Sequence, residues 1–145
     1  MAKVTFLLGL AGSGKSRLAE QLKRETGAEI FEGVEGVERP ESLPTMVQHL
    51  RDDKDCVVEE IAYCHPDARK KVITYLRSQV PDAEIEWVCF ENDLESANWN
   101  VIHRTNKGDV ENHLAINKHW HGLYKCPDGA KIIPITRIDE NKTTE

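Results

Sequence analysis

The sequence lacks several features that would assign it to a membrane-spanning, disulfide-rich or nucleic-acid-binding class. No apolar run is long enough to span a bilayer, so we expect no transmembrane helix. The 19 Lys and Arg residues are outnumbered by 25 Asp and Glu, and the formal net charge of −6 argues against a broad footprint on duplex nucleic acid. The 4 cysteines show no CxxC spacing, so we expect free thiols in a reducing, cytoplasmic environment.

The composition is that of a globular domain rather than a disordered chain. Apolar residues make up 39% and charged residues 30% of the 145 positions, and no internal repeat or low-complexity tract occurs. We expect one domain over residues 1–138, followed by a polar tail over residues 139–145. The apolar run near the N-terminus leads directly into a glycine-rich motif, so we interpret it as a strand rather than a signal peptide.

Short apolar runs alternate with amphipathic segments along the chain. We expect strands over residues 4–8, 28–31, 56–58, 85–90 and 132–135. We expect helices over residues 15–26, 42–53, 66–79, 92–104 and 109–124. Asn92 followed by Glu95 predicts a capping box, and Pro134 places the last strand at a sheet edge. This alternation predicts an α/β fold in which a parallel sheet of about five strands carries helices on both faces.

The segment from Gly9 to Ser16 matches GxxxxGK[ST], the phosphate-binding loop (P-loop) motif of nucleoside triphosphate sites. A buried strand before it and a helix after it supply the context in which backbone N–H groups converge on phosphate oxygens. We expect Lys15 to reach the outer phosphates and the Ser16 hydroxyl to bind Mg²⁺. The residues expected to hold the nucleotide are Gly9, Ala11, Gly12, Ser13, Gly14, Lys15, Ser16 and Arg17.

A triphosphate site also needs an acidic residue for the metal ion. Glu59 and Glu60 follow the apolar run Cys56–Val58 at the end of a predicted strand. Because Glu59 comes directly after the buried residues, we predict that it binds Mg²⁺ together with Ser16.

A second motif points to a different class of protein. The segment from Asn106 to Asp109 matches NKxD, which reads guanine in GTPases, where it ends a buried strand. Here the preceding residues 99–105 have a helical pattern, and no DxxG segment occurs in the chain. We therefore predict that ATP rather than GTP is bound.

Three segments resemble the small P-loop kinases grouped with polynucleotide kinase, gluconate kinase and the zeta-toxin kinases. They are residues 6–19 (FLLGLAGSGKSRLA), 57–69 (VVEEIAYCHPDAR) and 94–104 (LESANWNVIHR). The resemblance implies a P-loop NTPase three-layer sandwich with a small helical lid at about residues 92–125.

The resemblance also implies catalytic residues. Arg104 matches the second of two lid arginines, whereas Asn100 stands where the family has the first. The family's general base follows the second strand, and Glu32 is our first choice for it, with Glu35 and Glu38 as alternatives. In place of a Thr-Asn pair that helps to hold the acceptor, this chain has Ile61 and Ala62.

From these observations we expect an ATP-dependent, Mg²⁺-dependent kinase whose catalytic residues are Lys15, Glu32 and Arg104. The acceptor would be a small molecule or a polynucleotide 5′-hydroxyl, and the net acidity favours the small molecule. The alternative is a nucleotide-binding switch or a plain ATPase without an acceptor.

Four further side chains carry expectations about their surroundings. We expect Trp87 in the core, and Trp99 or Trp120 as a candidate to stack on the adenine base. We expect Arg69 on the surface, as a charge near the start of its helix.

Overall fold

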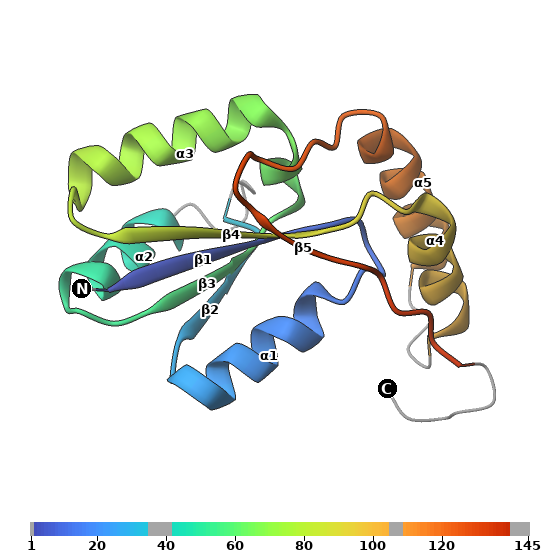
Figure 1. Cartoon of the computed structure of the whole chain (residues 1–145), viewed down its shortest axis with the longest axis horizontal. Coiled ribbons are helices and arrows are strands. Elements are labelled where there is room, and N and C mark those ends of the chain that lie inside the picture. Colours follow the sequence, from blue (N-terminus) through green and yellow to red (C-terminus); the bar gives the residue numbers. More distant parts are fainter. Residues whose placement is uncertain (1, 35–41, 105–108, 140–145) are drawn as a thin grey trace.

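The computed structural model describes residues 2–34, 42–104 and 109–139. A five-stranded sheet of order β2-β3-β1-β4-β5 forms its centre, and each neighbouring pair of strands is parallel (Figure 1). The strands are β1 (Lys3–Leu8), β2 (Glu29–Glu32), β3 (Cys56–Glu59), β4 (Glu84–Phe90) and β5 (Lys131–Ile133). The helices are α1 (Lys15–Thr26), α2 (Ser42–Arg51), α3 (Pro66–Gln79), α4 (Leu94–His103) and α5 (Val110–His121), with a short 3₁₀ helix η1 (Ile61–Cys64). The predicted α/β class and the parallel sheet are confirmed.

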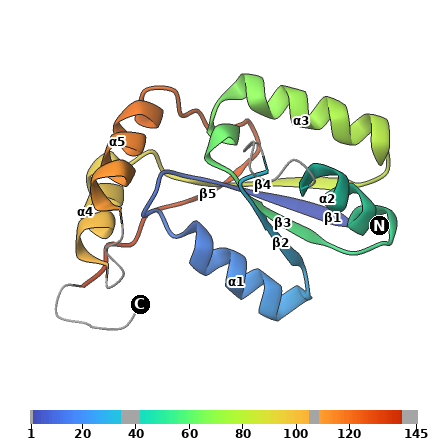
Figure 2. The ribbon, with the colours of Figure 1, turned by 180° about the vertical axis from the view of Figure 1, so that it is seen from behind.

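Helices cover both faces of the sheet (Figures 1 and 2). On one face, Ala19 of α1 packs with Leu7 of β1 and with neighbouring buried strand residues. On the other face, Phe6 of β1 belongs to the main core together with buried residues of α2 and α3. Consecutive β1 residues point to opposite faces because side chains alternate along a strand. The predicted three-layer sandwich is thereby confirmed.

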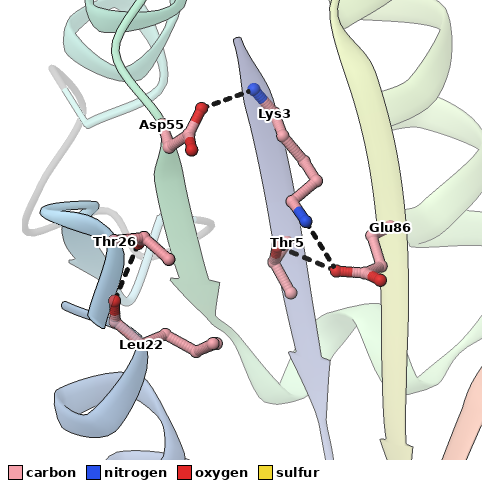
Figure 3. A network of polar contacts seen from close by, with 6 residues as sticks. All are labelled: Lys3, Thr5, Leu22, Thr26, Asp55 and Glu86. Carbon is pink, nitrogen blue, oxygen red and sulfur yellow. Dashed lines mark hydrogen bonds and ion pairs between the residues drawn. The ribbon is translucent and has the colours of Figure 1, made fainter. Parts of the chain in front are cut away.

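Polar groups form hydrogen bonds and an ion pair near the amino ends of the central strands (Figure 3). The backbone N–H of Lys3 donates to Asp55 Oδ1 at 2.9 Å, and its ammonium group lies 3.3 Å from Glu86. The buried Thr5 hydroxyl donates to the same carboxylate of Glu86 at 3.4 Å. The polar Thr5 is therefore accommodated among the buried apolar residues of β1.

Local sequence signals set the boundaries of α1 and α3. Gly14 and Gly27 flank α1 with positive φ values of 112° and 77°, a conformation that costs glycine little. The N–H of Gly27 donates back to Lys23 O at 2.9 Å, which closes the last turn. α3 begins at Pro66, after His65 caps it by accepting from the N–H of Asp67 at 3.1 Å.

α4 and α5 pack against each other beyond the carboxyl ends of the strands (Figures 1 and 2). The predicted cap at Asn92 is wrong, because Asp93 accepts the hydrogen bond from the N–H of Ser96 at 3.1 Å. Asn92 instead donates to the carbonyl of His121 at 2.9 Å and so ties the start of α4 to the end of α5. β5 lies at the sheet edge, as predicted, and Pro134 directly follows it.

The expectation of free thiols throughout is wrong for two of the four cysteines. Cys89 of β4 and Cys126, after α5, form a disulfide with a Cα–Cα distance of 6.0 Å. The bond closes a loop that contains both α4 and α5. The remaining two, Cys56 and Cys64, are free and buried. Sequence spacing did not indicate the pair because the fold brings together residues 37 positions apart.

The expected surface position of Arg69 is also wrong. This side chain is buried, donates to the carbonyl of Tyr63 at 2.8 Å and lies over the ring of Trp87 at 6.0 Å. Burial lowers the pKa of Arg69. Trp87 itself stacks on Phe6 with ring centroids 4.4 Å apart and packs against the core, as predicted.

Among the helices in the described ranges, none is sufficiently long and apolar to cross a membrane.

Candidate nucleotide-binding site

The predicted P-loop connects the carboxyl end of β1 to the start of α1. Gly12 has a φ of +86°, and a Cβ added there would meet the carbonyl oxygen of Ala97 in α4 at 2.4 Å. A Cβ at Gly9 would meet Ser13 Oγ at 2.4 Å. The backbone approach of α4 therefore requires glycine at position 12, whereas a side chain at position 9 would displace Ser13.

The Lys15 ammonium group is buried and donates a hydrogen bond to the carbonyl of Gly9. Burial lowers the pKa of Lys15, and the neighbouring Cys64, Glu59 and Glu60 act in the opposite direction. Within the described ranges, Ser13 Oγ is a buried oxygen without a hydrogen-bond partner. A buried cation and an orphaned hydroxyl on one loop fit an anionic ligand, which would supply acceptors to both.

Ser16 and Glu59 meet as predicted for a magnesium site. The Ser16 hydroxyl donates to Glu59 Oε1 at 2.9 Å, and Glu59 is paired in register with Glu32 on β2. Burial raises the pKa of Glu59, and the charge of Glu32 adds to this rise, whereas the Ser16 hydrogen bond opposes it. Glu35 and Glu38, the alternatives to Glu32, lie outside the described residues.

The hydroxyl oxygen of Ser16 and the carboxylate oxygens of Glu59 are of the kind that Mg²⁺ prefers as ligands. No group of three or more His, Cys, Asp or Glu side chains that could hold a metal ion occurs among the residues that the structure describes. Mg²⁺ does not require such a group of side chains, because it is commonly held by one or two protein oxygens together with phosphate oxygens and water. Ser16 and Glu59 supply such oxygens beside the loop.

An open cavity of about 730 Å³ runs from the loop toward the edge of the sheet. Its phosphate-loop side is formed by residues 12–18, and its far side by Phe90, Ile133, Pro134, Thr136 and Ile138, with Asn100, Arg104 and Gln21 also at its wall. Gly9 and Ala11 are not among its lining residues, and neither are Trp99 and Trp120. A polar loop that continues into an apolar wall suits a ligand with a phosphate end and a flat, less polar end.

Arg104 reaches the cavity as the residue that ends α4. Its Nη2 lies 2.5 Å from Nδ1 of His113 in α5. Arg104 lines the same cavity as Lys15, Ser16 and Arg17. Glu32 is not among the lining residues of this cavity and instead lies beside Glu59 in the sheet.

The NKGD segment falls largely outside the described residues, which omit 105–108. Its last residue, Asp109, precedes α5 in a left-handed conformation with φ 62° and accepts a hydrogen bond from Asn112 at 3.2 Å. The described residues on either side of this segment belong to α4 and α5, whereas the motif ends a buried strand in GTPases.

Sequence reasoning missed two residues that contact the loop. Asn117 of α5 and Asn100 of α4 hydrogen-bond to the backbone of Ala11 and Gly12. The sequence marks Asn100 only as a departure from the lid arginine. A single buried asparagine carries no sequence signal for such a contact, because its partners lie 106 and 88 residues away.

Solved structures provide the comparison with known proteins. A gluconokinase from Sinorhizobium meliloti 1021 is similar with a TM-score of 0.63 and 16% identity, over 94% of this chain and 84% of that one. A sugar kinase from Janibacter sp. HTCC2649 is similar with a TM-score of 0.57 and 15% identity, over 98% of this chain and 87% of that one. No protein-family model matches the sequence, and a search of curated proteins found no match.

The chain therefore has the fold of the small P-loop kinases. The resemblance inferred from its sequence is confirmed at the level of the fold.

Proposed function

We propose that this protein binds ATP with Mg²⁺ and transfers the γ-phosphoryl group to a hydroxyl of a small molecule. The observation that carries the proposal is the phosphate-binding loop, in which the half-buried Lys15 donates to the carbonyl of Gly9 and the Ser16 hydroxyl lies 2.9 Å from Glu59 Oε1. A cation, a hydroxyl and a carboxylate are thereby assembled around one glycine-rich turn. This is the combination that phosphoryl transfer from a nucleoside triphosphate requires.

Each loop residue has a role that follows from its position. The N–H groups of the loop and the N-terminus of α1 would receive phosphate oxygens, and Lys15 would neutralise the outer phosphates. Ser16 and Glu59 would hold Mg²⁺, which supplies charge neutralisation on the phosphates when bound. Since metal-binding carboxylates must be ionised, Glu59 would give up any proton it carries as the metal enters.

The transfer step needs a base and a cation at the transition state. Glu32 ends the strand next to Glu59, and we propose that it takes the proton of the acceptor hydroxyl. The acceptor oxygen forms a bond to the γ-phosphorus as the bond to the bridging oxygen of ADP breaks. Arg104, at the cavity wall, would stabilise the negative charge that develops on the transferred group.

Two observations support a small, hydroxyl-bearing acceptor. The similar structures are named as a gluconokinase and a sugar kinase. The chain is acidic, with a net charge of −6, which disfavours a polynucleotide. A switch or plain ATPase is the second candidate, because Ile61 and Ala62 offer no side-chain hydrogen bonds where related kinases hold the acceptor.

Measurement of ATP turnover with and without acceptors separates these functions. We would assay ADP release with a panel of sugars, sugar acids, polyols, nucleosides and 5′-hydroxyl oligonucleotides, and identify phosphorylated products by mass spectrometry. The proposal expects at least one small-molecule acceptor to raise turnover and gain a phosphoryl group, and Lys15→Ala to abolish this. Turnover that no acceptor accelerates would support the ATPase, and phosphorylation of oligonucleotides alone would contradict the acceptor class.

A further inference from the structure

A fully buried asparagine in α5 holds the backbone of the phosphate-binding loop. Asn117 accepts a hydrogen bond from the N–H of Ala11 at 2.8 Å and donates one to the carbonyl of the same residue at 2.9 Å. Its second amide hydrogen is donated to Asn98 Oδ1 of α4 at 3.0 Å. The side-chain amide thus pairs with a loop residue as a neighbouring strand would, although the two lie 106 positions apart in sequence.

A second buried asparagine, Asn100 of α4, holds the next peptide group. Its amide donates to the carbonyl of Gly12 and to that of Thr136, each at 2.9 Å. Its oxygen accepts from the N–H of Ile138 at 2.7 Å. Asn100 therefore links the loop to the segment after β5, and both parts line the same cavity.

These contacts fix Ala11, which directly precedes the residues that line the loop end of the cavity, and Gly12, which is the first of those residues. The N–H and the carbonyl of Ala11 and the carbonyl of Gly12 would lose their partners without the two side chains. A buried peptide group without a partner is costly, so the loop would shift to find one. Close contact between Gly12 and Ala97 of α4 leaves the loop little room to move as long as the helices stay docked.

We propose that Asn117 and Asn100 are positioning residues that preset the P-loop for nucleotide and couple nucleotide binding to the docking of α4 and α5. The inference rests on the proposed function, since it assigns the nucleotide to this loop. This role explains an asparagine at position 100, because its side chain is only 6% exposed and its amide donates to two backbone carbonyls. If nucleotide binding and the docking of α4 and α5 both favour this arrangement of the loop, each must favour the other by the same free energy.

The test compares Asn117→Ala with two matched variants. Asn112→Ala removes an exposed asparagine from the same helix, whose described contact is with Asp109. Val47→Ala shortens a buried side chain of α2, and so lowers stability without touching the loop. For each protein, we would measure the Kd of Mg–ADP by calorimetry, the Tm, and hydrogen exchange of the loop amides without nucleotide.

The proposal expects Asn117→Ala to weaken Mg–ADP binding by about tenfold or more, which corresponds to roughly 1.4 kcal/mol. Exchange at Ala11, whose N–H donates to Asn117, should accelerate in the same variant. Asn112→Ala should bind as the wild type does, and Val47→Ala should lose Tm but keep its Kd. An unchanged Kd and unchanged loop exchange in Asn117→Ala would overturn the proposal and leave the asparagine a structural role alone.

Asn98→Ala provides the test if Asn117→Ala does not fold. It removes only the third hydrogen bond of Asn117 and leaves both contacts with Ala11 in place. We expect a smaller loss of affinity, of about two- to threefold, with faster exchange at Ala11, whereas wild-type values for both would overturn the proposal. A wild-type protein that binds no nucleotide would refute the proposed function, and loop exchange would still decide whether Asn117 positions the loop.

Discussion

The disulfide between Cys89 and Cys126 should contribute a large share of the stability of the fold. It closes a loop of 37 residues that carries α4 and α5. The loop-closure relation for an unfolded chain of this length gives about 13 cal/mol/K, or roughly 4 kcal/mol at 25 °C. Replacing Cys126 with Ser removes the cross-link while Cys89 keeps its contact with the Tyr124 hydroxyl at 3.1 Å. We therefore expect Cys126→Ser to lower the free energy of unfolding by about 2–4 kcal/mol.

Urea unfolding followed by circular dichroism, with and without dithiothreitol, measures this contribution. The wild type should lose stability when reductant is added, whereas Cys126→Ser should respond little because Cys56 and Cys64 are already free. Cys56→Ala is the matched control, since it removes a buried thiol and leaves the disulfide intact, so it should still respond to reductant. Equal stability of the wild type with and without reductant would refute the reasoning and restore the expectation of free thiols throughout.

Three further predictions concern the site. The pKa of Glu59 is raised in the folded protein, so its protonation stabilises the fold fully at a pH below the pKa of the unfolded chain, and this stabilisation is lost as pH rises through the folded pKa. Glu59→Gln should remove this fall of Tm with rising pH. The same variant should weaken Mg²⁺-dependent nucleotide binding by about tenfold. Arg104→Ala should lower kcat by on the order of 10³ while the Kd of ATP changes little, and equal effects on both constants would contradict a transition-state role. Competition binding should favour ATP over GTP, because Asp109 lies at the start of helix α5, and a tenfold preference for GTP would revive the GTPase interpretation.

The parts of the molecule that the sequence predicts well depend on local patterns. The loop from Gly9 to Ser16 follows from residues within one strand, one turn and one helix. The meeting of Ser16 with Glu59 was also predictable, because the carboxyl ends of parallel strands share one edge of the sheet. Strand and helix boundaries differ from the expectation by a few residues, as at Asp93, where the cap depends on which side chain reaches the N–H of Ser96.

The features of the core and of the site that were missed depend mainly on contacts that helical or strand periodicity does not encode. Arg69 looks like a surface charge on its helix, but the ring of Trp87 and the carbonyl of Tyr63 give it a buried position. Cys89 and Cys126 come together only when the α4–α5 pair folds back to the sheet. The role of Asn117 requires knowing that α5 passes the loop, which no periodicity or spacing within the helix reveals.

Titration of Mg–ATP into the wild type and into Lys15→Ala, by isothermal calorimetry in conditions where turnover is slow, tests the central claim most directly. Lys15 supplies the cation at the head of the loop, and alanine removes that charge. Circular dichroism spectra and Tm values of both proteins establish that each is folded. The account predicts saturable, one-to-one binding to the wild type and a loss of at least about a hundredfold, or roughly 2.7 kcal/mol, in the variant. Equal affinity of the two folded proteins for Mg–ATP would contradict the assignment of this loop as the nucleotide site.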